Sequence, residues 1–195
     1  MKSFLYFAAF SVQFAAPGFA DGPLADKSVK ELIVLLKDKD AKNRGFAALQ
    51  VGKRRAGGLE AVPTLIELLK DKDAWVRARA AEGLGGVGIL AKAAVPALLE
   101  ALKDKDADVR ETAAESLADI NADADKVVPA LIELLKDEDF NVRTAAATSL
   151  GDFKAAAKSA IPALKKAEQD KSKFVRDAAS VSIRRIERAM QQRDS

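Results

Sequence analysis

The sequence predicts an all-α protein, a right-handed α-solenoid of about five helix pairs. An eight-residue motif, KDKDAWVR at residues 70–77, returns with small changes at residues 37–44, 103–110 and 136–143, and more loosely at 169–176. Its closing arginine recurs every 33 residues, and a fixed period of this length is typical of repeat architectures. Leucine, alanine, lysine and glutamate are abundant and aromatic residues are few, as in a helical chain.

The first helix of each repeat is expected to begin near a recurring proline. Pro63 suits the first turn of a helix, because the N–H that proline lacks is not needed there. The same proline returns every 33 residues, at Pro96, Pro129 and Pro162. The residues that follow Pro63 are apolar around most of the helix, so this helix should be buried between its neighbours. The first repeat lacks the proline, but Ser28 and Glu31 have the spacing of a capping box.

The second helix of each repeat is expected to begin after the last aspartate of the motif. Asp73 precedes four apolar residues at helical spacing: Val76, Ala80, Leu84 and Val87. An aspartate in this place can accept hydrogen bonds from the free N–H groups of the first turn. The equivalent positions hold Asp40, Asp106, Asp139 and Ser172. Asp71 and Lys72 should then form the polar turn that ends the first helix.

Paired alanines mark the middle of the second helix in four repeats. Ala80 and Ala81 have counterparts at Ala47, Ala48, Ala113, Ala114, Ala146 and Ala147. Small side chains allow two helices to approach closely. The unit is therefore expected to be an antiparallel helix pair that needs a neighbouring unit to cover its apolar faces.

These motifs together resemble the HEAT repeat. The P-x-L-x-x-L-L, D-x-x-V-R and A-A-x-x-L-G patterns look most like the short variety named after phycobiliprotein lyases, in five copies over residues 28–189. Asn43 and Ser172 depart from the pattern, and both lie in terminal copies. Ankyrin repeats share the 33-residue period, but their T-P-L-H signature is missing from the sequence.

The resemblance implies ladders of aspartate and arginine between successive repeats. On this interpretation the ladder would pair Asp73, Asp106 and Asp139 with Arg77, Arg110 and Arg143. As surface ion pairs, each would contribute only about 0–1 kcal/mol to stability. A row of catalytic aspartates is the alternative, but a device repeated in every unit favours a structural role.

The composition excludes several classes of function. The 195 residues include no cysteine and no histidine, which removes thiolate nucleophiles, disulfides, a lipoprotein anchor, most zinc sites and the usual general base. The net charge of +3 does not by itself indicate nucleic acid. We therefore expect no catalytic residue, no cofactor, no metal and no nucleic-acid partner.

Residues 1–20 have the layout of a secretory signal peptide. Lys2 precedes an apolar run, and the small residues Gly18 and Ala20 predict cleavage after Ala20. The run at residues 4–16 is shorter than the ~20 residues of a membrane span. An uncleaved anchor and a spurious translation start are the alternatives. Residues 21–195 should then form a single solenoid domain that is periplasmic or secreted.

The side of the second helices opposite their buried positions is the candidate binding face. In a HEAT-like arrangement this side is concave, and helical angle places these residues on it: Ala78, Arg79, Glu82, Gly86, Glu111, Thr112, Glu115, Asp119, Thr144, Ala145, Thr148 and Asp152. The middle of the face should therefore be acidic. The candidate partner-binding residues are Trp75, Arg79, Glu82, Glu111, Glu115, Asp119 and Asp152. A solvated face without a partner is the alternative.

Two further features depart from the repeat pattern. Trp75 takes a place that polar residues hold in three other repeats, which indicates either a binding hot spot or packing on the adjacent turn. Phe174 is its other apolar equivalent, and Phe140 lies one position earlier in its own repeat. Residues 154–195 carry 11 basic and 5 acidic residues, whereas residues 21–153 carry 20 and 24. A polar cap on the last repeat explains this charge, and contact with an anionic membrane or polymer is the alternative.

The function expected from the sequence is a non-enzymatic scaffold outside the cytoplasm. Its concave face would hold a protein or peptide, and the acidic residues favour a basic one. The alternative, which rests on the resemblance alone, is a lyase-like enzyme or chaperone for a bilin-type chromophore. HEAT-like iron enzymes use histidine and are excluded. HEAT-like DNA glycosylases fit neither the signal peptide nor the modest charge.

Overall fold

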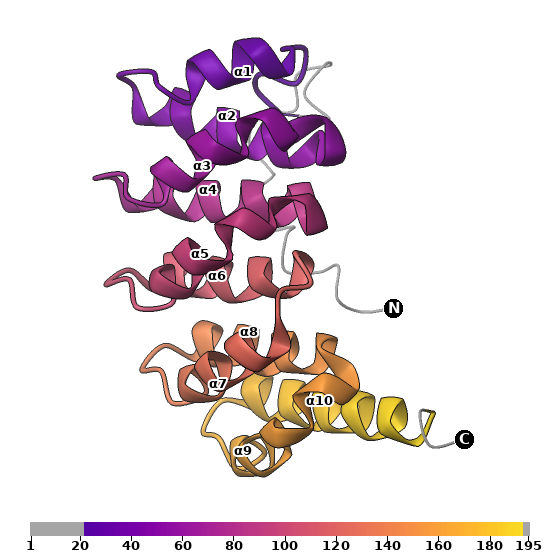
Figure 1. Ribbon diagram of the computed structural model, residues 1–195. Helices are drawn as coiled ribbons and strands as arrows, with labels where there is room; N and C mark the ends of the chain where they lie inside the picture. The colour runs from indigo at the N-terminus through magenta and orange to yellow at the C-terminus, as the bar shows by residue number, and fades with distance from the viewer. Residues whose placement is uncertain (1–21, 193–195) are drawn as a thin grey trace.

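The computed structural model describes residues 22–192, which form five helix pairs stacked along one axis (Figure 1). The pairs are α1 (Val29–Leu35) with α2 (Ala41–Lys53), α3 (Val62–Leu68) with α4 (Ala74–Val87), α5 (Val95–Ala101) with α6 (Ala107–Asp119), α7 (Ala124–Leu134) with α8 (Phe140–Asp152), and α9 (Ile161–Ala167) with α10 (Lys173–Gln191). Short 3₁₀ helices precede three of the first helices: η1 (Arg55–Ala61), η2 (Gly88–Ala94) and η3 (Lys154–Ala160). The predicted all-α solenoid is confirmed. The signal peptide predicted at residues 1–20 lies outside the described residues.

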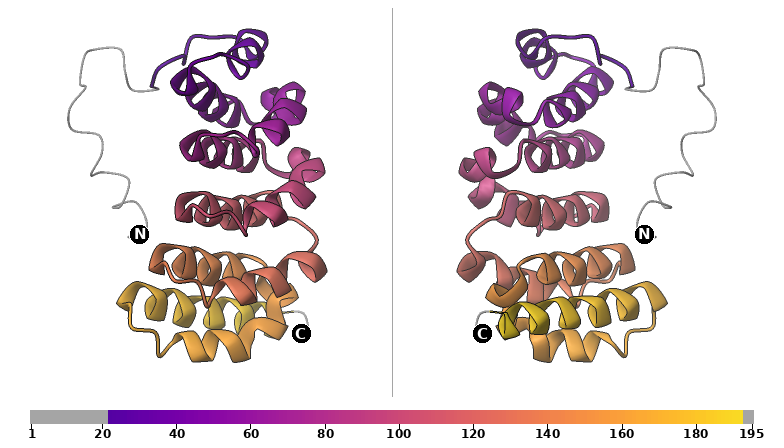
Figure 2. Two further views of the ribbon diagram at one scale, coloured as in Figure 1. Left: turned by 90° about the vertical axis from the view of Figure 1, so that its left-hand side faces the viewer. Right: turned by 90° about the vertical axis from the view of Figure 1, so that its right-hand side faces the viewer.

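The helices form two layers with the core between them. Figure 2 shows the second helices stacked in one layer and the first helices in the other. Each second helix packs on the next one along the chain as well as on its own first helix. One leucine of each second helix from α4 to α8 is fully buried between the layers: Leu84, Leu117 and Leu150. Neighbouring repeats therefore complete one another's core, as expected for a solenoid.

Two helices that contain several glycines, α2 and α4, approach each other closely. A Cβ atom added to Gly86 would lie 2.7 Å from the Cα of Gly52, and one added to Gly83 would lie 2.5 Å from the carbonyl oxygen of Ala48. Real Cβ contacts are not this short, so only glycine fits at these positions. Further along the stack a serine takes part, because the Ser116 hydroxyl donates to the carbonyl of Ala81 at 2.8 Å.

One stretch of the described chain is long and apolar enough to cross a membrane by length and composition, Ala74–Ala101, with a hydropathy of 1.5. It comprises α4, η2 and α5, and the chain turns at Gly88, where φ is +73°. Its apolar residues include Leu84 and Leu98, both fully buried in the core. The apolar composition of this stretch is therefore explained by the residues that it contributes to the solenoid core.

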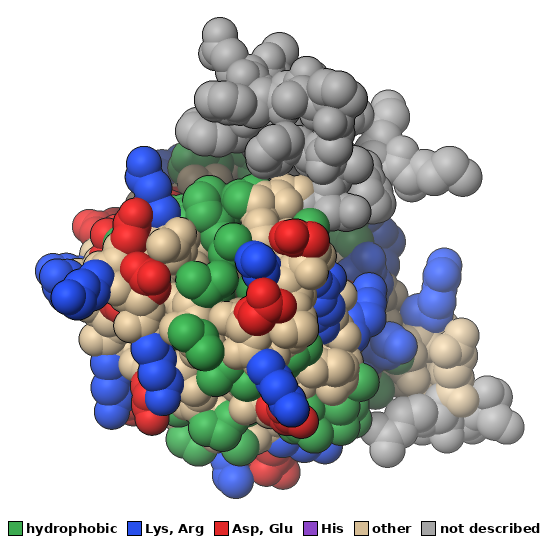
Figure 3. Space-filling model, turned by 90° about the horizontal axis from the view of Figure 1, so that it is seen from above, with side chains coloured by type: hydrophobic (Ala, Val, Ile, Leu, Met, Phe, Trp, Pro, Cys, Tyr) green, Lys and Arg blue, Asp and Glu red, His purple; other side chains and the backbone are tan. Residues whose placement is uncertain are grey.

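The end of the stack formed by the first repeat has no repeat above it in the described chain. Seen from this end, hydrophobic side chains lie among charged ones (Figure 3). Val34 of α1 is 71% exposed. The charged groups suit a terminal repeat whose outer side faces water, whereas the exposed side chain of Val34 does not.

The predicted helix caps are confirmed at four of the five second helices. Asp73 accepts a hydrogen bond from the N–H of Trp75 at 2.9 Å, and the same bond recurs at Asp40, Asp106 and Asp139. The prediction is wrong for Ser172, which holds the cap position but makes no capping bond with its side chain. The capping box of Ser28 and Glu31 is present.

The recurring proline opens three first helices but not the fourth. Pro63, Pro96 and Pro162 lie in the first turns of α3, α5 and α9, as predicted. Pro129 instead lies inside α7. The reason is local, because Asp123 caps α7 by accepting the N–H of Asp125 at 3.2 Å, so this helix starts before the proline.

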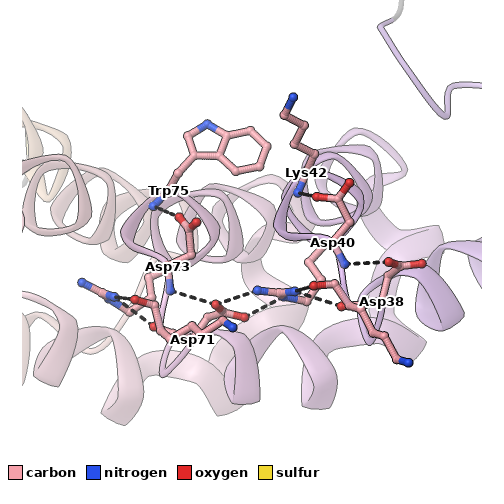
Figure 4. Close-up of polar contacts among 10 residues, drawn as sticks. Asp38, Asp40, Lys42, Asp71, Asp73 and Trp75 are labelled. Carbon is pink, nitrogen blue, oxygen red and sulfur yellow. Dashed lines mark hydrogen bonds and ion pairs between the residues drawn. The ribbon is translucent and has the colours of Figure 1, made fainter.

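The ladder between repeats exists, but the aspartates predicted for it were the wrong ones. Arg77 makes two hydrogen bonds to Asp104 of the following repeat, both 2.7 Å long. Asp73 instead caps its helix by accepting the N–H of Trp75 (Figure 4). The other rungs are Arg44 with Asp71, Arg110 with Asp137, and Arg143 with Asp170. Each arginine also donates to a backbone carbonyl in its own turn, for example Arg77 to Asp71 at 2.9 Å.

The rungs are buried, contrary to the prediction of surface pairs. The side chains of Arg77 and Asp104 are only 8% and 14% exposed. Burial works against the ionised carboxyl of Asp104, but the hydrogen bonds from Arg77 and from the N–H of Asp106 hold its pKa below the usual 3.8. A buried ion pair becomes costly when one partner is removed, because the other is left as an unpaired charge.

Candidate partner-binding surface

The outward side of α2, α4, α6, α8 and α10 is called here the second-helix surface. Most predicted residues do lie on it: Arg79, Glu82, Glu111 and Thr112 are half-buried, and Glu115, Asp119, Thr148 and Asp152 are exposed. The prediction is wrong for Ala78 and Ala145, which are 1% and 5% exposed. The helices that carry these alanines, α4 and α8, each have a second helix on both sides, so positions at the edges of their outward sides are covered.

Two of the predicted acidic residues are neutralised by ion pairs. Glu82 lies 2.7 Å from Arg79 on the same helix, and Asp152 lies 2.7 Å from Arg185 on α10. The three acids of α6 differ from these. Within residues 22–192, no lysine or arginine nitrogen lies within 4 Å of the carboxylates of Glu111, Glu115 or Asp119. The negative charge is therefore concentrated on α6.

The protein surroundings raise the pKa of each of these carboxyls. Glu115 keeps contact with water, but the many protein atoms around it desolvate its carboxyl and raise its pKa to about 7. The nearby charges of Glu111, Asp119 and Glu82 add to the rise, while Arg79 opposes it. Desolvation is also the main cause of the raised pKa values of Glu111 and Asp119. An opposite charge would lower these values and stabilise the ionised forms.

A depression of about 330 Å³ lies on this surface between α6, α8 and α10. Its lining is Glu111, Glu115, Phe140, Asn141, Thr144, Ala145, Thr148 and Phe174. The rings of Phe140 and Phe174 stack with their centroids 6.1 Å apart and an interplanar angle of 26°. The two phenylalanines are nevertheless 41% and 51% exposed. The depression thus combines an aromatic platform with two carboxyl groups.

Sequence reasoning missed this aromatic pair. Phe140 and Phe174 are 34 residues apart, one more than the repeat period, so an alignment of the repeats does not place them in the same column. A shift of one residue within the first turn of adjacent second helices still leaves the two rings in contact. The available clue was that Phe174 has polar counterparts in three repeats, and that Phe140 stands where three repeats have the much smaller alanine.

A second depression, of about 700 Å³, lies toward the first repeat. Glu82 and Asp119 line it together with Lys53 and Arg55, and glycines such as Gly86 form part of its wall. The acidic row of α6 therefore connects two depressions, with Glu111 and Glu115 at one and Asp119 at the other. The second depression has mixed charge, so its electrostatic preference is weaker.

Trp75 packs against the neighbouring second helix and keeps an exposed edge. Its side chain leans from α4 toward α2 (Figure 4). It meets Phe46 edge to face with a centroid distance of 5.4 Å, and a Cβ on Gly45 would lie 2.0 Å from the indole ring. Trp75 is 38% exposed. Most of the Trp75 side chain is therefore used in packing between the two helices, and only its exposed edge could contact a partner.

The basic residues of the last repeat gather around a third depression, of about 520 Å³. It is lined by Lys154 and by Arg184, Arg185 and Arg188 of α10, together with the acidic Asp152. The Arg185–Asp152 pair removes one positive charge from this group. In the part of the chain that the structure describes, no group of three or more Asp and Glu residues is placed to hold a metal ion.

Comparison with known proteins agrees with this architecture. The model of the HEAT repeats family matches residues 29–118 and 95–184. No curated protein matches the sequence. Among solved structures, the complex of CpcE and CpcF of phycocyanin lyase from Nostoc sp. PCC7120 superposes with a TM-score of 0.76 at 28% identity, over 90% of this chain and 70% of that one.

Designed repeat proteins share the fold at lower identity. An engineered protein has a TM-score of 0.66 and 24% identity, over 81% of this chain and 78% of its own. A designed armadillo repeat protein, solved in complex with the peptide (KR)4, has a TM-score of 0.63 and 18% identity, over 81% of both chains. The family match spans most of the sequence, and the chain therefore belongs to the HEAT-repeat proteins.

Proposed function

We propose that this protein is a non-enzymatic scaffold that binds a basic segment of a partner protein on its second-helix surface. The observation that carries the proposal is the row of Glu111, Glu115 and Asp119 on α6. Like charges four residues apart on a helix repel by a few tenths of a kcal/mol. Each has a raised pKa, and none has a basic partner within 4 Å among residues 22–192, so a cationic ligand would relieve their repulsion.

The fold is suited to this role. HEAT-repeat solenoids present extended surfaces formed by successive repeats, on which an elongated segment can contact several helices. The designed armadillo protein of similar fold holds an alternating basic peptide, which is an example of such a solenoid binding a cationic chain. For this chain the support comes from its own acids. We also propose that the protein works outside the cytoplasm, on the basis of the residue pattern of its first 20 residues.

Charge reversal on α6 tests the proposal. The double variant Glu111→Lys with Glu115→Lys should abolish binding of an alternating Lys-Arg octapeptide, measured by fluorescence anisotropy, and binding by the wild type should weaken as salt is added. Glu100→Lys with Glu133→Lys is the matched control. These glutamates lie on first helices with side chains 75% and 72% exposed, and the change in net charge is the same.

Two outcomes would overturn the proposal. One is equal binding by the wild type and the α6 double variant across the salt series. The other is an equal loss of binding in the control pair, since that would mean that net charge rather than the second-helix surface governs association. Circular dichroism melts establish that both variants remain folded.

A second candidate function is supported by the similarity to the phycocyanin lyase complex. On this alternative the second-helix surface would hold a bilin-type chromophore or a chromophore-bearing protein. Purification of the native protein followed by absorption spectroscopy separates the two candidates. A coloured small molecule that co-purifies would favour the lyase-like function, and a single protein partner would favour the scaffold.

A further inference from the structure

We propose that the depression between α6, α8 and α10 receives an arginine side chain of the basic segment, which stacks on Phe140 and Phe174 and pairs with Glu111 and Glu115. The inference rests on the proposed function and specifies which residue of the partner is recognised. It starts from a combination found at this depression, a pair of exposed stacked rings next to two carboxyl groups.

The charge of the depression selects a cation. The ionisable side chains that line it are those of Glu111 and Glu115. Asp108 and Asp139 lie close enough to act on Glu111, and Glu82 and Asp119 act on Glu115. Arg79 is the basic group that opposes them, and it is already paired with Glu82. A ligand that entered here would meet a predominantly negative surface.

The hydroxyl groups of the wall change this preference little. The Thr144 hydroxyl donates to the carbonyl of Phe140 at 2.7 Å, so its donor is used within α8. The carboxylates of Glu111 and Glu115 supply acceptors for N–H donors from a ligand. These acceptors suit a ligand with several N–H groups.

The exposed phenylalanines favour arginine over lysine. A guanidinium is planar and weakly hydrated, so it stacks on an aromatic face while its N–H groups reach carboxylates in the same plane. A lysine ammonium is compact and strongly hydrated, and gains less from an aromatic platform. Phe140 and Phe174 remain 41% and 51% exposed although they stack on each other.

Two peptides of equal charge test the proposal. A labelled Ser-Arg octapeptide and a Ser-Lys octapeptide, each with four cationic residues, are titrated with the purified protein by fluorescence anisotropy. The wild type should bind the Ser-Arg peptide about three- to thirtyfold more tightly, which is the range expected for cation–π contacts. The double variant Phe140→Leu with Phe174→Leu should lose this preference while its affinity for the Ser-Lys peptide changes little.

Other variants guard against a purely structural effect. Thr148→Phe should fill the depression without removing either ring or any charge, and should also remove the arginine preference. Val181→Ala is the matched control, because Val181 is a 41% exposed residue of α10 outside the lining of this depression, and it should bind as the wild type does. Circular dichroism melts of each variant exclude unfolding as the cause of a loss.

The outcomes separate this inference from the proposed function. If the two peptides bind equally and the leucine double variant changes neither affinity, the arginine depression is overturned, while loss of binding on reversal of Glu111 and Glu115 would still support the scaffold. If Trp75→Leu removes the arginine preference and the phenylalanine variants do not, the depression is again overturned. If neither peptide binds the wild type, both proposals are overturned.

Discussion

Arg77 reaches across 27 residues to bind Asp104 and does not bind Asp73, which lies four residues before it. Its Nε and one terminal nitrogen each lie 2.7 Å from a carboxylate oxygen of Asp104. Asp73 meanwhile accepts the N–H of Trp75. The first two aspartates of the second, third and fourth motifs thus have separate roles. The first receives the arginine of the preceding repeat, and the second caps the following helix.

Removal of one member of a central rung should destabilise the whole stack. Arg110→Ala leaves the buried carboxylate of Asp137 without its partner, and we expect a loss of about 3–5 kcal/mol in the free energy of unfolding, measured by urea denaturation. Asp139→Ala removes only a cap and should cost about 0.5–2 kcal/mol. A smaller loss for Arg110→Ala than for Asp139→Ala would contradict the ladder interpretation.

Replacement of a central core leucine should also be costly. Leu117 is fully buried, so Leu117→Ala should lower the free energy of unfolding by about 2–5 kcal/mol. Leu59→Ala, at a residue that is 47% exposed in η1, is the control and should have a much smaller effect. Circular dichroism melts provide the comparison. No difference between the two variants would mean that the packing register of the third repeat is wrong.

Gly45→Ala should displace the indole of Trp75. The added Cβ would lie 2.0 Å from the ring, so the side chain must turn away into solvent. Trp75 is the one tryptophan of the sequence, and its fluorescence emission should shift to longer wavelength. Gly57→Ala is the control, because its Cβ would meet Arg54 at an ordinary 3.7 Å. An unchanged emission maximum in Gly45→Ala would show that the ring does not rest on α2.

The stability of the protein should fall on both sides of a maximum as pH changes. The pKa of Glu115 rises from 4.5 to about 7 on folding, so its contribution to stability is fully present below about pH 4.5 and is lost as pH rises through about 7. Burial opposes ionisation of Asp104, but its bonds to Arg77 and the Asp106 N–H hold its pKa below 3.8, so its contribution is lost at more acidic pH.

Glu115→Gln isolates the first of these effects. Thermal melts between pH 4.5 and pH 8 should show a shallower loss of stability in this variant than in the wild type, because the group that titrates near pH 7 has been removed. Glu133→Gln, at an exposed glutamate of α7, serves as the control. Parallel curves for the wild type and Glu115→Gln would contradict the assignment.

The protein should be exported and cut after Ala20. Intact mass spectrometry of material from the cell envelope should give the mass of a chain that begins at Asp21. A cytoplasmic fusion that lacks residues 1–20 is the control for export. Recovery of an exported chain that still contains residues 1–20 would support an uncleaved anchor instead.

The 33-residue repeat made the architecture predictable, because the same pattern of apolar and polar residues occurs in five copies. Val76, Ala80 and Leu84 follow the helical period closely enough to place both layers and the buried side of each second helix. Which aspartate of a motif receives an arginine could not be read in this way, because both Asp71 and Asp73 lie in the same turn and both accept backbone N–H groups.

The candidate surface was predictable only in its charge. Helical angle placed Glu111, Glu115 and Asp119 together, since the three share one helix and a spacing of four. Contacts between side chains of different repeats depend on small shifts in the relative positions of neighbouring helices, and these shifts cannot be predicted from the repeat pattern alone. The stack of Phe140 on Phe174 and the burial of Ala145 both arise from how closely α8 is flanked by its neighbours.

The spacing of the ion pairs between repeats also restricts how this chain can change its length. Each rung joins an arginine to an aspartate 27 residues later, and the rungs repeat every 33 residues. Duplication or deletion of one whole repeat preserves every such spacing, so a longer or shorter chain can close all its rungs at once. An insertion of another length within one of the helices between the two residues would move the aspartate out of line with its arginine. The ion pairs between neighbouring repeats therefore favour the gain or loss of whole repeats over other changes in the length of the solenoid.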